Sequence, residues 1–82
     1  MRRVVPLPLA GNGALVRVIG VDCGAGLASK LAELGIYPGA ILRVIASRRG
    51  PVIIEFLNSS NPHSNRLMIG FGIAMKILVE VM

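Results

Sequence analysis

The segment from residue 30 to residue 44, KLAELGIYPGAILRV, constrains the fold more than any other part of the chain. Gly35 follows the last helical residues and stands where a helix places a C′ glycine, which adopts positive φ without a steric penalty. Pro38 prevents the helix from continuing, and residues 37–40 carry proline and glycine where a type II turn favours them. The sequence therefore predicts a sharp corner that ends a helix and directs the next strand.

The residues before this corner have the periodicity of a short amphipathic helix. Leu27, Leu31 and Leu34 recur at spacings of four and three, so they form one apolar stripe. Lys30 and Glu33 point away from that stripe. We expect a helix of about three turns whose leucines cover part of the neighbouring strands.

The remaining residues are typical of short β-strands. The expected elements are an extended edge segment at 4–9, strands at 14–21, 40–46, 51–57, 66–69 and 76–81, a hairpin turn at 47–50, a polar loop at 58–65 and a single 3₁₀ turn at 73–75. Sheets this short protect their edges best by curling into a small barrel. We therefore predict one domain over residues 1–82. It is mainly β, an SH3-like barrel of about five strands with the helix inserted after the first strand.

Alternation along the strands separates an inner face from an outer one. Residues expected to face inward are Val16, Val18, Ile54, Phe56, Ile77, Val79 and Val81. Residues expected to face outward are Arg17, Glu55, Lys76 and Glu80. Further apolar residues fall on the outer face, namely Ile45, Ile53, Leu57 and Leu78. This surplus of apolar surface predicts a partner protein or self-association.

Composition limits the classes of partner. The formal net charge of +5 admits nucleic acid, an anionic membrane surface or an acidic protein face. Only Arg2–Arg3 and Arg48–Arg49 are adjacent, and three aromatic residues offer few stacking platforms, so nucleic acid is not expected. No apolar run is long enough to span a membrane. A single cysteine fits a reducing compartment, which favours the cytoplasm.

The titratable residues do not form a catalytic set. We expect Asp22 to cap the helix or to interact with its dipole, and Cys23 to be a small, partly buried residue. His63 lies in the polar loop, where it has no companion ligand in the nearby sequence. The sequence therefore predicts a protein that is not an enzyme and that has no cofactor and no metal ligand set. A metal site shared between subunits through His63 and Cys23 is an open alternative.

Three segments, LAELGIYPGAILRVI, RGPVIIEF and LMIGFGIAMKILVEV, together resemble the ferrous iron transport protein A (FeoA) family. The residues that carry the resemblance are Leu31, Leu34, Gly35, Ile36, Pro38, Gly39, Gly50, Pro51, Ala74, Ile77 and Val79. The opening segment, VVPLPLAGNGALVRVIGV, is also similar to the start of the family. Among these residues we assign a structural role to Gly35, Pro38, Gly39, Gly50, Pro51 and Ala74.

The resemblance implies an SH3-like barrel with an accessory role in bacterial ferrous iron uptake, acting on the cytosolic side of the membrane transporter FeoB. We expect the helix and corner, and the basic hairpin, to face the partner. The corresponding residues are Leu27, Lys30, Leu31, Leu34, Tyr37, Pro38, Arg43, Arg48 and Arg49. Two alternatives are a basic barrel that binds nucleic acid and a metal-sensing module related to the C-terminal domain of metal-dependent repressors.

Overall fold

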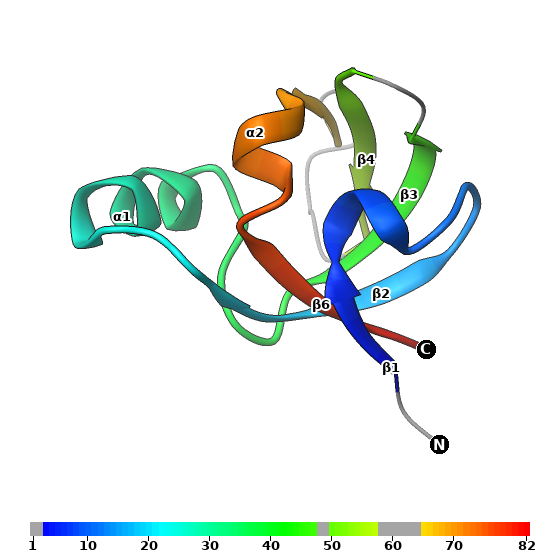
Figure 1. The fold of residues 1–82 in the computed structure, drawn as a ribbon, viewed down its shortest axis with the longest axis horizontal. Coiled ribbons are helices and arrows are strands. Elements are labelled where there is room, and N and C mark those ends of the chain that lie inside the picture. The colour runs from blue at the N-terminus through cyan, green and yellow to red at the C-terminus, as the bar shows by residue number, and fades with distance from the viewer. Residues whose placement is uncertain (1–2, 48–49, 58–64) are drawn as a thin grey trace.

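The structure is a computed structural model that describes residues 3–47, 50–57 and 65–82. Its elements in chain order are β1 (Arg3–Pro6), the 3₁₀ helix η1 (Leu7–Leu9), β2 (Leu15–Val21), α1 (Ala25–Glu33), β3 (Ile41–Ser47), β4 (Val52–Phe56), β5 (Arg66–Ile69), α2 (Phe71–Ala74) and β6 (Ile77–Val81). The strands form one sheet in the order β1-β6-β2-β3-β4-β5, and all neighbours are antiparallel. The sheet curls around a core, with α1 projecting at one end (Figure 1). The predicted class, mainly β with short helices, is confirmed.

Three details differ from the sequence expectation. The segment 4–9 divides into β1 and η1, so the described residues form six strands, and α1 follows the second of them. β1 is an edge strand that pairs only with β6, a position in which Pro6 is tolerated. The expected 3₁₀ turn at 73–75 is instead the short helix α2, in which the amide of Met75 donates to the carbonyl of Phe71 at 2.9 Å. That i→i−4 bond defines an α-helical turn.

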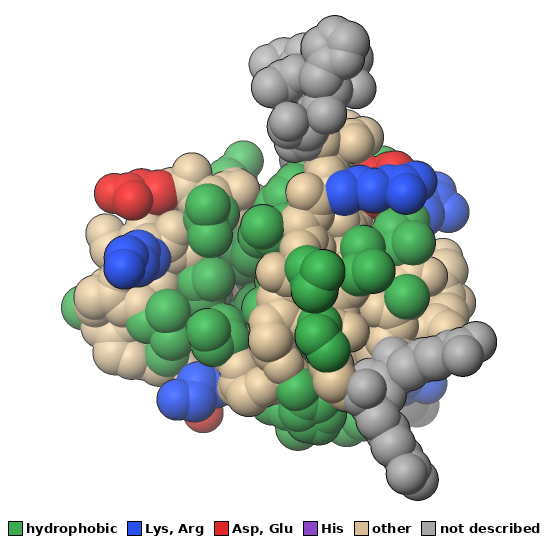
Figure 2. Space-filling view, turned by 90° about the horizontal axis from the view of Figure 1, so that it is seen from above, with side chains coloured by type: hydrophobic (Ala, Val, Ile, Leu, Met, Phe, Trp, Pro, Cys, Tyr) green, Lys and Arg blue, Asp and Glu red, His purple; other side chains and the backbone are tan. Residues whose placement is uncertain are grey.

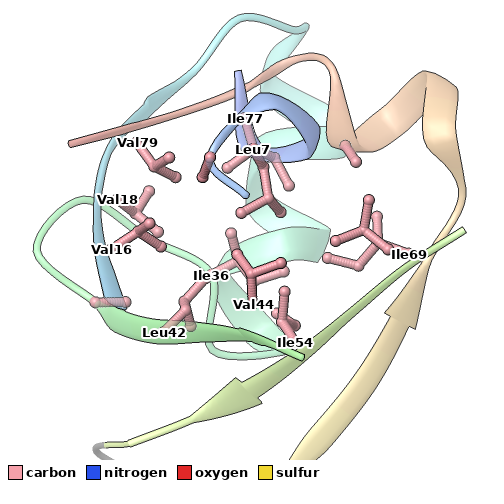
Figure 3. Close-up of a cluster of buried hydrophobic side chains, with 14 of the residues drawn as sticks. Leu7, Val16, Val18, Ile36, Leu42, Val44, Ile54, Ile69, Ile77 and Val79 are labelled. Atoms are coloured by element: carbon pink, nitrogen blue, oxygen red, sulfur yellow. The ribbon is translucent and has the colours of Figure 1, made fainter. Parts of the chain in front are cut away.

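The core is aliphatic, as the composition predicts. Val16, Val18, Ile54, Ile77 and Val79 all point inward and are buried, which confirms the predicted strand faces (Figure 3). Phe56 and Val81 are half-buried and pack against the edge of this core. Leu7 of η1 is also fully buried at the centre of the cluster, although the sequence suggested only an extended edge segment there.

Glu80 is the main correction to the strand assignment. We expected it to face solvent, but the residue is only 9% exposed. β6 lies between β1 and β2, where Val4 and Arg17 are the cross-strand neighbours of Glu80. The Nη2 of Arg17 donates to the Oε1 of Glu80 at 2.7 Å, so the arginine side chain covers the carboxylate. Glu80 therefore points away from the apolar core and is still buried.

Two register shifts bend the sheet. One lies between Val18 and Gly20 where β2 pairs with β6, and the other lies between Val44 and Ala46 where β3 pairs with β4. Such bulges increase the local twist and help a short sheet to curl. The helix α1 projects from one end of this curled sheet (Figure 1).

Candidate partner-binding surface

The end of α1 is fixed by hydrogen bonds that match the sequence prediction. Gly35 has a φ of +105°, and its amide donates to the carbonyl of Ala32 at 3.0 Å. The amide of Ile36 donates to the carbonyl of Leu31 at 2.8 Å. These two bonds form a Schellman motif, in which the residue after the glycine folds back on the helix. Ile36 and Leu31 are both buried in the core, so the motif fastens the C-terminal end of α1 to the barrel.

The turn after Ile36 is also as predicted. Gly39 has a φ of +97°, and the amide of Ala40 donates to the carbonyl of Tyr37 at 3.0 Å, as in a type II turn with Pro38 at its second position. The amide of Gly39 donates to the carbonyl of Val18 at 2.8 Å. The turn is therefore held against β2, and Tyr37 and Pro38 are exposed on that side of the molecule.

The structure divides the leucines of α1 into three environments. Leu31 is buried, Leu27 is half-buried, and Leu34 is 54% exposed. Leu34 is the C-cap residue, beyond the last full turn of α1, so the predicted stripe does not continue onto the barrel at this position. Lys30 is exposed as expected. Of the residues expected to face a partner, Leu34 and Lys30 are accessible on α1, whereas Leu31 serves the core.

The helix α2 contributes exposed apolar residues that the sequence did not predict as part of a binding surface. Phe71, Ile73 and Met75 are all large apolar residues, and each is exposed by 36% or more. Figure 2 shows several separate groups of hydrophobic side chains on this face of the molecule. We name Leu34, Phe71, Ile73 and Met75 the α1–α2 surface. The signal in the sequence was the segment GFGIAM, in which large apolar residues occupy a turn too short to bury them.

In the basic hairpin, Arg43 has a charged residue as its cross-strand neighbour on β4. Arg43 is exposed on the outer face of β3 and lies opposite Glu55 of β4, whose other neighbour is Arg66 of β5. The Nε of Arg66 donates to the Oε2 of Glu55 at 3.3 Å. Arg43 thus belongs to a row of charges across three strands. Arg48 and Arg49, like His63 and most of the polar loop, lie outside the described residues.

The remaining residues to which a structural role was assigned are Gly50, Pro51 and Ala74. Gly50 and Pro51 directly precede β4, and Pro51 is exposed. Ala74, the last residue of α2, is fully buried, so a larger side chain at this position would displace core residues.

The start of α1 differs from the expectation for Asp22. The N-cap is Gly24, and no side chain accepts a hydrogen bond from the first turn. Asp22 is exposed, and its backbone amide donates to the carbonyl of Lys76 at 2.7 Å. Asp22 therefore joins the end of β2 to the start of β6, and it does not cap the helix. Cys23 is a half-buried free thiol.

The part of the chain that the structure describes contains no group of three or more histidine, cysteine or acidic residues that could hold a metal ion. Over the same residues, none of the helices has the length and apolar character needed to cross a bilayer. The described surface offers exposed apolar side chains at the end of α1 and on α2, an arrangement suited to binding another protein.

Comparisons with known proteins identify the family and the fold. The model of the FeoA domain family matches residues 5–81. A crystal structure of an iron uptake regulatory protein (FeoA) superposes with a TM-score of 0.80 at 31% identity, over 98% of this chain and 99% of that one.

Two NMR structures are also similar. A FeoA-like protein from Clostridium acetobutylicum gives a TM-score of 0.77 at 21% identity, over 100% of this chain and 91% of that one. The FeoA protein from Chlorobium tepidum gives a TM-score of 0.77 at 20% identity, over 95% of this chain and 70% of that one. No curated protein matches. The fold is therefore the SH3-like fold of FeoA structures, and the chain belongs to the FeoA domain family, whose members are non-enzymatic accessory domains associated with ferrous iron uptake.

Proposed function

We propose that this protein is a cytoplasmic accessory protein of ferrous iron uptake that binds the cytosolic side of a FeoB-type transporter. The observation that carries the proposal is the α1–α2 surface, because four large apolar side chains are exposed there. Family membership supplies the transport process. The transporter is the natural partner because it is the membrane component of the same process.

The C-terminal end of α1 is bonded to the core beneath this surface in the helical state. The Schellman motif and the buried side chain of Ile36 hold that end against the core. The glycine at position 35 also lies close to Phe56 of β4, which limits movement of the corner. In the helical state of α1, a partner that docks at Leu34 therefore meets a defined position at the edge of the core.

The test is a binding titration against the cytosolic domain of the transporter and the detergent-solubilised transporter from the same organism. The variant Phe71→Ser/Ile73→Ser removes two exposed apolar side chains from the surface. We expect its affinity to fall at least about tenfold, because apolar anchors in a protein interface commonly contribute more than 1 kcal/mol each. Leu34→Ser should weaken binding in the same direction.

The matched control is Met68→Ser. Met68 is the most exposed large apolar residue of the described chain, at 65%, but it lies on β5 outside the α1–α2 surface. Its affinity should stay within about twofold of the parent, since the substitution leaves the surface intact. Absence of binding by the parent protein, or equal losses for Met68→Ser and Phe71→Ser/Ile73→Ser, would contradict the proposal.

A further inference from the structure

We infer that α1 is in equilibrium with a locally unwound state while the barrel stays folded, and that binding of the transporter stabilises the helical state. The second part of the inference rests on the proposed function, and the first part does not. The observations that support it are the sequence of the first turn, the burial of the helix and the way its two ends are held.

The first turn of α1 has little intrinsic stability. Its N-cap is Gly24, whose backbone is extended but which has no side chain to accept a hydrogen bond from the helix. Gly26 occupies the same turn, where glycine is among the least favourable residues for a helix. The first turn also contains no acidic residue to interact with the helix dipole. The helix therefore lacks both a side-chain cap and an acidic residue at its N-terminus.

The packing of α1 against the barrel compensates only in part for the low intrinsic stability of its first turn. Among the nine residues of α1, Leu31 alone is buried, and Leu27 and Ala28 are half-buried. The other residues of the helix are exposed, and α1 projects away from the sheet (Figure 1). A short helix in water depends mainly on the burial of its apolar face. With one buried side chain, α1 has less of this stabilisation than the strands around it.

Both flanks of the helix are fastened to the barrel independently of α1. On one side the amide of Asp22 donates to the carbonyl of Lys76 at 2.7 Å. On the other side Ile36 is fully buried, and the amide of Gly39 is bonded to the carbonyl of Val18. Residues 23–34 can therefore unwind between two fixed points. A segment with few buried contacts and fixed boundaries is the kind of unit that opens without global unfolding.

Unwinding would change the α1–α2 surface directly. Leu34 is held by the final hydrogen bonds of the helix, in which its amide donates to the carbonyls of Leu31 and Lys30. A partner that contacts Leu34 in the helical state binds that state better than the unwound one. By linkage, such a partner shifts the equilibrium toward the helix.

The first experiment measures amide hydrogen exchange in the free protein. We expect the amides of residues 28–34 to exchange faster than those of β2 and β6, and by a route that does not expose the sheet. The variant Gly24→Asp/Gly26→Ala should slow exchange in α1 by about fivefold to tenfold. The first substitution adds a side chain that can cap the helix, and the second replaces glycine by a residue of higher helix propensity. Neither site has an atom within 4 Å of the added Cβ, so steric strain is not introduced.

The control is Gly72→Ala, which replaces a glycine of the other helix, α2, and also has open space around the added Cβ. It lowers the entropy of the unfolded chain as Gly26→Ala does, but it should leave exchange in α1 unchanged. Exchange of α1 at the same rate as the core strands in the parent protein would overturn local opening. Equal slowing of α1 by Gly72→Ala would overturn it as well.

The second experiment adds the cytosolic domain of the transporter at a free concentration ten times its dissociation constant. Exchange in α1 should slow by about tenfold, the factor expected when a ligand binds only the closed state, with no change in the sheet. Binding with unchanged exchange in α1 would overturn the coupling and leave the proposed function in place. Absence of binding would overturn the proposed function and the coupling together, while local opening is decided by the first experiment alone.

Discussion

Gly35, in the corner after α1, lies against the ring of Phe56 on β4: a Cβ at Gly35 would be 3.1 Å from the Cε1 of that ring. The backbone at Gly35 also has a φ of +105°, which residues with a side chain rarely adopt. Two independent constraints therefore act on this position, one from the backbone and one from a strand far away in the sequence.

Replacement of Gly35 should be strongly destabilising. We expect Gly35→Val to lower the free energy of unfolding by about 3–5 kcal/mol, from backbone strain together with displacement of the Phe56 ring. A loss of this size approaches the whole stability of a small domain. Urea denaturation followed by circular dichroism measures it. A Gly35→Val protein with the parent stability would rule out this account of the corner.

A comparison of two alanine variants separates the two constraints. Gly39→Ala meets a similar positive φ of +97°, but no atom lies within 4 Å of its added Cβ. It should therefore show the backbone effect alone, about 1–2 kcal/mol. Gly35→Ala should lose more than Gly39→Ala, and the excess should shrink in the Phe56→Leu background. Equal losses in the two variants would show that the contact with Phe56 contributes nothing.

The corner was predictable from sequence because its determinants are local. Gly35 and Pro38 act on the backbone of their own few residues, and they specify a helix end and a turn wherever they occur in this order. The contact between Gly35 and Phe56 was not predictable, since it depends on where β4 lies relative to α1. Burial of Glu80 was missed for the same reason, because alternation shows which face a residue occupies and not which strands flank it.

The ion pair between Arg17 and Glu80 should contribute more to stability than the pair between Arg66 and Glu55. The side chains of the first pair are 39% and 11% exposed, whereas those of the second are 62% and 21% exposed. Solvent screening is weaker for the first pair, so its coupling energy should be about 1–2 kcal/mol. The second pair should give less than about 1 kcal/mol.

Double-mutant cycles with Arg17→Met/Glu80→Gln and Arg66→Met/Glu55→Gln measure both couplings. Each cycle compares the single and double variants by denaturant unfolding, so changes that belong to one residue alone cancel. A larger coupling for Arg66 and Glu55 would contradict the burial argument.

The 3₁₀ helix η1 should stabilise the core through the side chain of Leu7. Its side chain is fully buried, so Leu7→Ala should lower the free energy of unfolding by about 2–5 kcal/mol. Leu9, in the same short helix, is 58% exposed, and Leu9→Ala should change stability by no more than about 0.5 kcal/mol. Thermal and urea unfolding of the two variants provide the measurement. Similar effects at both positions would show that η1 only continues the edge strand.

The turn at residues 11–13 should be fastened to β3 through Asn12. The Oδ1 of Asn12 accepts a hydrogen bond from the amide of Ser47 at 2.6 Å. Asn12→Ala removes the acceptor and should cost about 1 kcal/mol of stability, while Asn12→Asp keeps an oxygen in place and should cost less. Hydrogen exchange at the Ser47 amide reports the bond directly. Unchanged protection of that amide in Asn12→Ala would contradict the assignment.

The candidate surface was only partly visible in the sequence. Leu34 and Lys30 were identified from helical periodicity, but the same periodicity assigned Leu34 to a buried stripe that ends one turn earlier. Phe71 was assigned to a break after the strand at 66–69 and Ile73 to a single 3₁₀ turn, because a helix of four residues is too short to show a period. Whether such residues are buried depends on the sheet beneath them, which is a property of the complete fold.

β6 lies between β1 and β2 in the sheet, although the ribosome makes it after every other strand described here. Arg3 pairs with Val81, so closing this part of the sheet joins residues separated by almost the whole length of the chain. The loss of chain entropy in such a closure precedes any gain from the contacts, and topologies of this kind fold slowly, in milliseconds to seconds. During synthesis the core must therefore wait for β6 to leave the exit tunnel, and until then the inner faces of β1 and β2 lack the strand that joins them.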